Sequence, residues 1–122
     1  MNSRSLFLVV SMALLAASAV LVVNPANAVS AIPRPAPQTL TGVVSDSFCG
    51  TTHSMKNMTA ADCTRMCVKA GLKYALVVGA DVYALQGHDS DLQRLAGETV
   101  MVKGSVNGKT VTIDSVVRVK KP

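Results

Sequence analysis

The chain has 122 residues, with 12 Lys and Arg against 7 Asp and Glu, which gives a formal net charge of +5. Only 3% of its residues are aromatic and none is Trp, so it offers few of the stacking side chains that bind single-stranded nucleic acids, and we expect no nucleic-acid partner. Its length fits one small domain with a limited core, of the size that gains support from a disulfide or a bound metal.

Residues 1–28 have the pattern of a secretory signal peptide. Arg4 gives the start a positive charge, an almost unbroken apolar run extends from Leu6 to Val23, and Ala26-Asn27-Ala28 is an A-x-A cleavage site. We expect cleavage after Ala28, a periplasmic or secreted protein, and no stable membrane span after cleavage. Because the apolar run approaches the length that crosses a bilayer, an uncleaved anchor stays open as a minor alternative.

A proline-rich spacer is predicted next, over residues 29–37, where three prolines at alternate positions favour extended polyproline II. The β-rich stretch from Leu40 to Asp46 predicts the first strand, and Gly42 marks a bulge or a bend in it. The chain is predicted to end in a basic tail at 120–122.

Two helices and four further strands are predicted after the first strand. Thr59-Ala60-Ala61-Asp62 has the S/T-x-x-D/E form of a helix start, with Gly71 at its end, and Asp89 or Ser90 caps a shorter helix over 91–96. Asn107-Gly108 predicts a type I′ hairpin turn between the last two strands. The strands are expected over 73–78, 82–85, 99–106 and 110–119.

This order of elements resembles the OB-fold, whose five-stranded barrel carries a helix between its third and fourth strands. The resemblance rests on the L-x-G-x-V opening at Leu40 and on the G-E-x-V-x-V-x-G-x-V run from Gly97 to Val106. It implies a mostly β domain over residues 38–119: an OB-fold-like barrel of five strands with short helices. A helical Cys-rich insert would lie between its first two strands.

A closer resemblance is to small secreted bacterial OB-fold-like proteins of uncharacterised function. They share a T-G-x-V-x-D-S-x-C-G-x-x-H start and a C-x-x-x-C-V-K-x-G helix, which stand here at 41–53 and 63–71. The resemblance implies export and the fold, and it implies no activity.

All three cysteines and one of the two histidines lie between residues 49 and 67. Cys63 and Cys67 are one helical turn apart and project from the same helical face, so Cys49 and His53 can complete a tetrahedral site for zinc. Three nearby thioethers favour copper(I) as an alternative ion and are possible supplementary ligands. They belong to Met55, Met58 and Met66.

A disulfide is the alternative interpretation of this segment, because exported proteins commonly oxidise their cysteines. Cys49 would pair with Cys67 or with Cys63, while a bond between the two helical cysteines has poor torsional geometry. One thiol is then left over, whereas the metal site uses all three. Both interpretations remain open at this stage.

No common catalytic motif occurs in the chain, so we expect that it is not an enzyme. The function predicted is an exported, non-catalytic binding protein that holds zinc or copper through its Cys/His insert. The alternative is a disulfide-stapled structural or interaction module that contacts another envelope protein. A thiol redox protein, with His53 as the base for Cys49, is a third alternative.

Overall fold

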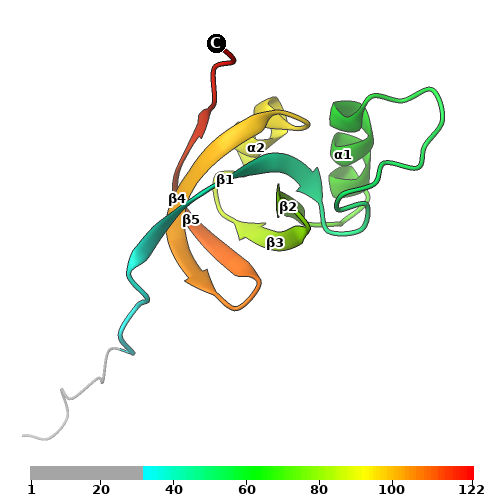
Figure 1. The fold of residues 1–122 in the computed structure, drawn as a ribbon. Helices are drawn as coiled ribbons and strands as arrows, with labels where there is room; N and C mark the ends of the chain where they lie inside the picture. The colour runs from blue at the N-terminus through cyan, green and yellow to red at the C-terminus, as the bar shows by residue number, and fades with distance from the viewer. Residues whose placement is uncertain (1–31) are drawn as a thin grey trace, which may run out of the picture. The chain divides into compact units, whose positions relative to one another are not determined.

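The computed structural model describes residues 32–122, so the predicted signal peptide lies outside the described residues. Within that range the predicted order of elements is confirmed (Figure 1). The elements are β1 (Pro37–Asp46), α1 (Ala60–Lys69), β2 (Tyr74–Val78), β3 (Asp81–Gln86), α2 (Asp89–Leu95), β4 (Thr99–Asn107) and β5 (Thr110–Arg118). No helix in this part of the chain is long and apolar enough to cross a membrane.

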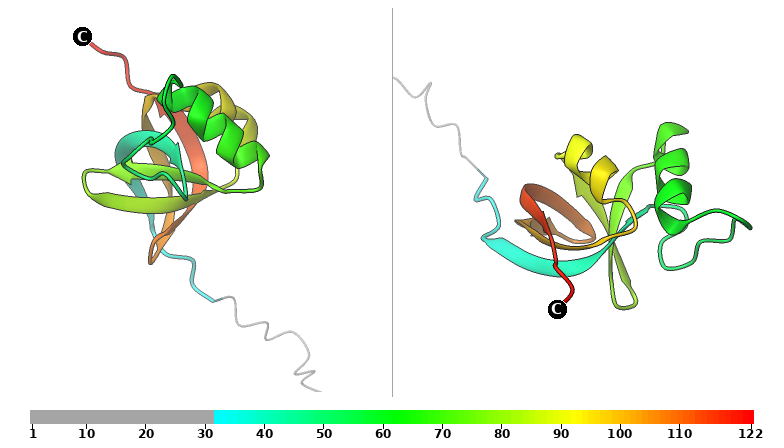
Figure 2. Two further views of the ribbon diagram at one scale, coloured as in Figure 1. Left: turned by 90° about the vertical axis from the view of Figure 1, so that its right-hand side faces the viewer. Right: turned by 90° about the horizontal axis from the view of Figure 1, so that it is seen from above.

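The five strands form one sheet that closes on itself. They are paired in the order β1-β2-β3-β5-β4, and β4 pairs in turn with β1, so the described strands form a ring. Every pairing is antiparallel except that of β3 with β5, which is parallel. Both helices lie outside this ring, and α1 stands with the loop before it at one side of the sheet (Figures 1 and 2).

The core fills the ring with aliphatic side chains from alternating strand positions. Val100 and Val102 of β4 are fully buried, whereas Met101 between them is exposed, as the predicted alternation requires. Leu92 of α2 is also fully buried and closes the core from the helix side. The buried residues of this cluster are Val44, Tyr74, Leu76, Leu85, Leu92, Val100, Val102, Val111 and Ile113.

Gly42 is required by a close approach of backbones. A Cβ at this position would lie 2.3 Å from the carbonyl oxygen of Val77, which leaves no room for a side chain. The next residue, Val43, pairs with both β2 and β4, so Gly42 stands where β1 passes from one partner to the other. The register shift of the sheet falls elsewhere, between Lys103 and Gly104 of β4.

Several strand ends differ from the sequence prediction by one residue, and the start of β1, the start of α2 and the last turn differ more clearly. β1 begins already at Pro37, which is the first residue of the strand and pairs with β4 alone, a position where a sheet tolerates proline. α2 begins at Asp89 because His88 takes the N-cap position with a φ of 58°. The last hairpin turns at Gly108-Lys109, where the φ of Gly108 is 58° and that of Lys109 is not positive, which is the type II′ pattern instead of type I′.

Candidate metal centre

Helix α1 presents two of the three cysteines, and both of its ends are fixed. The hydroxyl of Thr59 accepts the backbone N–H of Asp62 at 3.1 Å, as the sequence predicted. At the other end the N–H of Leu72 donates to the Cys67 carbonyl at 3.1 Å and that of Gly71 to the Val68 carbonyl at 2.9 Å, which is a Schellman motif. The capped helix therefore holds its cysteines in a fixed orientation.

The third cysteine is positioned by a carboxylate at the end of β1. Asp46 Oδ1 accepts the backbone N–H of Cys49 at 2.9 Å and that of Phe48 at 3.1 Å. The N–H of Gly50 donates to the Asp46 carbonyl at 3.0 Å, and Gly50 has a φ of 54°, which turns the chain back toward α1. This tight turn brings Cys49 against the helix.

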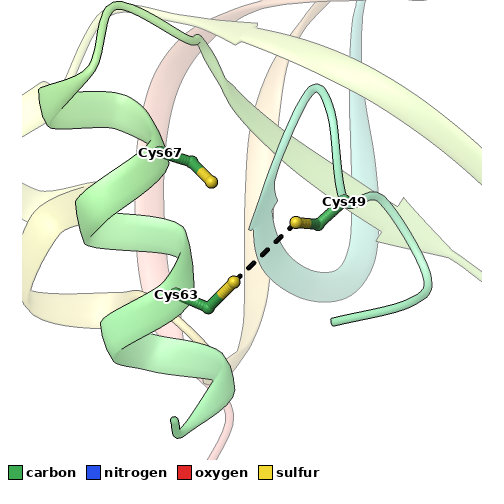
Figure 3. A group of neighbouring side chains, drawn as sticks. All are labelled: Cys49, Cys63 and Cys67. Carbon is green, nitrogen blue, oxygen red and sulfur yellow. Dashed lines mark hydrogen bonds between the residues drawn. The ribbon is translucent and has the colours of Figure 1, made fainter. Parts of the chain in front are cut away.

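The three cysteine side chains meet at one point. Figure 3 shows Cys63 and Cys67 projecting from the same side of α1 toward Cys49. The Cys49 and Cys63 sulfurs are 3.8 Å apart, and all three sulfurs lie within 4.8 Å of one another. Sulfurs at two corners of a tetrahedron around a metal, each about 2.3 Å from it, stand about 3.8 Å apart. The sulfurs are thus already near the spacing that a bound ion would impose.

All three cysteines are free thiols. Cys63 and Cys67 are buried and Cys49 is half-buried. The sulfur separation of 3.8 Å is well beyond the length of a disulfide bond, which is about 2.05 Å. No disulfide is therefore formed between them in this structure.

His53 belongs to a second group that shares Cys49. One ligand atom each from Asp46, Cys49 and His53 lie within 4.8 Å of one another. No group of this kind among the described residues brings His53 together with Cys63 or Cys67. The four ligands predicted from the sequence are therefore divided between two adjoining groups, with Cys49 in both.

The imidazole of His53 is held in one tautomer by a serine. Ser45 donates its only hydroxyl proton to the Gly50 carbonyl at 2.8 Å. The contact of 3.4 Å between Ser45 Oγ and His53 Nε2 is then a long hydrogen bond in which Nε2 is the donor. In the neutral ring, Nδ1 is left with a free lone pair, and this atom is buried with no hydrogen-bond partner. Ligating histidines are typically fixed through their other nitrogen in this way.

Asp46 is the residue of this site that the sequence prediction missed as a ligand. Its side chain is fully buried, and its second oxygen, Oδ2, has no hydrogen-bond partner. A buried carboxylate oxygen without a partner is costly, and a cation bound at this position could satisfy it. The signal in the sequence is an aspartate at the end of a buried strand, three residues before Cys49.

The protein environment stabilises the protonated form of Cys49 and Cys67. Burial raises the pKa of Cys49 from its usual value of 9.0 to about 12, and the hydrogen bond with Cys63 and the charge of Asp46 add to this effect. Burial also raises the pKa of Cys67, with the Asp46 charge as the second cause. An ion that binds here must displace these protons, and metal-free Cys49 is a poor nucleophile.

The predicted supplementary ligands lie at the surface. Met55, Met58 and Met66 are 44%, 37% and 41% exposed, respectively. Met66 lines an open groove of about 1050 Å³ between α1, β2 and α2, and none of the cysteines, Asp46 or His53 lines it. A role of the methionines as ligands stays a prediction.

His88 stands apart from the site, as a surface histidine at the start of α2. Its Nδ1 lies 3.1 Å from a carboxylate oxygen of Asp91 in the first turn of that helix. It belongs to neither group of candidate ligands.

Comparison with protein families, with curated proteins and with solved structures finds no match to this chain. The argument for a function therefore depends on the arrangement of its own side chains.

Proposed function

We propose that this chain is an exported, non-catalytic binding protein that holds a zinc or copper(I) ion at the cluster of Cys49, Cys63 and Cys67. The proposal includes an OB-fold-like architecture, which the cyclic strand order and the helix between β3 and β4 support. The signal-peptide pattern of residues 1–28 supports the export.

The observation that carries the proposal is the convergence of three thiols beside two unpartnered polar atoms. The sulfurs lie within 4.8 Å of one another, and Asp46 and His53 each place a ligand atom within 4.8 Å of the Cys49 sulfur. Each of these two side chains also has a buried atom without a partner, which is Oδ2 in Asp46 and Nδ1 in His53. A structural disulfide would explain two sulfurs and leave the carboxylate and the imidazole unexplained. Metal binding would account for both the thiols and the unpartnered atoms, because thiolate, imidazole and carboxylate are the ligands that zinc uses.

The donor set favours zinc, with copper(I) as the alternative ion. Zinc accepts sulfur, nitrogen and oxygen ligands, so it suits the donors of both groups, whereas copper(I) would bind the three sulfurs alone. The raised pKa of Cys49 speaks against a thiol redox function, since the thiolate is the reactive form and its share at neutral pH is small.

The test combines a metal measurement with a thiol count on one sample. The full chain is expressed with its own N-terminal segment, purified without reductant or chelator, and divided between metal analysis and thiol titration in denaturant. We expect bound zinc or copper and three titratable thiols. The variant Cys63→Ser should bind less metal than the original chain, while the matched control His88→Asn, which changes a surface imidazole, should bind the same amount.

The disulfide-stapled module remains the second candidate because one observation favours it. The Cys49 and Cys63 sulfurs lie 3.8 Å apart, so a modest rotation of the two side chains would allow a bond that staples the loop after β1 to α1. Cys67 would then be the spare thiol. The same sample distinguishes the two functions, because one titratable thiol and no metal would support the staple and contradict the metal site.

A further inference from the structure

We propose that the site holds two metal ions that share Cys49 as a bridging ligand. One ion lies among Cys49, Cys63 and Cys67, and the other lies among Asp46, Cys49 and His53. This inference rests on the proposed metal-binding function and adds the number of ions, the bridging residue and a ligand set that includes Asp46.

The first argument is geometric. Each of the two groups contains three donor atoms within 4.8 Å of one another, and Cys49 is the only member of both among the described residues. No such group combines His53 with Cys63 or Cys67, so one ion cannot reach all the donors equally well. A thiolate sulfur has lone pairs for two ions, and ions about 2.3 Å from a shared sulfur stand roughly 3.5–4 Å apart, as in known two-metal sites.

The second argument is the charge of the occupied site. Ligating thiols are deprotonated, so three thiolates and the Asp46 carboxylate together carry a formal charge of −4. The ion pairs found in residues 32–122 involve other carboxylates, and none involves Asp46. A single divalent ion would leave half of this charge uncompensated in a largely buried place, whereas two divalent ions neutralise it.

The third argument is that Asp46 and His53 each keep one buried donor atom without a partner. Asp46 Oδ1 is occupied by two backbone N–H groups, which leaves the buried Oδ2 free to bind an ion. His53 Nε2 is directed to Ser45, which leaves the buried Nδ1 free in the same way. Each side chain is thus held through one atom and keeps the other without a partner, in the way that hydrogen bonds fix metal-binding side chains.

The test is a zinc titration of the reduced, metal-free full chain, followed by native mass spectrometry. We expect the protein to bind two zinc ions. Asp46→Asn and His53→Asn should each reduce the number to one, Cys63→Ser should also reduce it to one, and Cys49→Ser should abolish tight binding. The matched controls Asp114→Asn and His88→Asn, which change exposed residues, should still bind two ions.

Cobalt(II) gives a second readout that needs no variant. Thiolate-to-cobalt charge-transfer absorption should rise until two equivalents are bound, and the electron paramagnetic resonance signal per cobalt should fall on binding of the second ion, because a shared sulfur couples the two spins. Saturation at one ion by both methods would overturn the bridged site and leave the proposed function intact. Two ions in both Asp46→Asn and His53→Asn would also overturn it. A chain that binds no zinc at all would contradict the proposed function itself.

Discussion

The interior of the closed sheet and the cysteine cluster are both buried, but their side chains are satisfied in different ways. Inside the sheet, residues such as Val44, Leu76 and Val100 are fully buried and contact other aliphatic groups. At the cluster, Asp46 Oδ2 and His53 Nδ1 are buried without partners beside three free thiols. Unsatisfied polar groups of this kind concentrate at functional sites. We infer that burial inside the sheet stabilises the fold, whereas the unpartnered atoms at the cluster destabilise the metal-free protein.

The largest effect should come from breaking the sheet core. Leu76→Ala removes a fully buried side chain and should lower the free energy of unfolding by about 3–5 kcal/mol, in the metal-free and the metal-loaded protein alike. Met101→Ala changes an exposed side chain and should stay within about 0.5 kcal/mol. Urea unfolding measures both variants, and equal losses would show that the sheet interior is not the main source of stability.

Metal removal should have the next largest effect. At a free zinc concentration one hundred times the Kd, binding should stabilise the native protein by about 3 kcal/mol, which corresponds to a fall in Tm of roughly 10–20 °C when a chelator removes the ion. Scanning calorimetry with and without chelator measures this shift. Cys49→Ser should show almost no shift, and an equal shift in this variant would place the stabilising ion elsewhere.

Asp46→Asn should separate the effect of Asp46 on the stability of the metal-free protein from its effect on metal binding. The amide oxygen still accepts the N–H groups of Phe48 and Cys49, but the unpaired buried charge is gone. We expect the metal-free variant to be more stable than the original chain by about 1 kcal/mol, and the zinc-loaded variant to be less stable. Denaturant unfolding of both forms tests this, with Asp114→Asn as the control. A less stable metal-free variant would mean that Asp46 serves the turn alone.

The smallest effect at neutral pH should come from thiol ionisation. The pKa of Cys49 is raised to about 12 in the folded protein, so the unfolded thiol loses its proton first as the pH rises above 9.0. The contribution of this thiol to the free energy of unfolding is therefore fully present below about pH 9 and is lost as the pH rises toward 12. Metal-free protein unfolded in urea at a series of pH values should show this loss, and Cys49→Ser should show a smaller one. Parallel curves for the two proteins would contradict the assignment.

Much of the fold could be predicted from the sequence because its signals are local. The alternation of Val100, Met101 and Val102 gives the buried face of β4, and the Thr59 to Asp62 pattern gives the start of α1. The errors fall where tertiary context decides. The prolines predict a spacer where β1 in fact begins, because the start of this strand is set by its pairing with β4. The position of the final turn is set by the pairing of Asn107 with Thr110.

The candidate site could be predicted in part. Helical spacing places Cys63 and Cys67 on one face, and the three sulfurs do come together. The position of His53 could not be derived from spacing, because it depends on the hydrogen bond to Ser45 and on the turn that Asp46 builds. Asp46 itself was missed because a strand-end aspartate gives no sign in the sequence that its second oxygen is buried and unpartnered.

The most direct test is X-ray absorption at the zinc edge of the purified full chain loaded with zinc. We expect sulfur neighbours at about 2.3 Å, together with a nitrogen or oxygen contribution at about 2.0–2.1 Å that weakens in His53→Asn. A first shell of nitrogen and oxygen without sulfur would contradict a metal site at Cys49, Cys63 and Cys67.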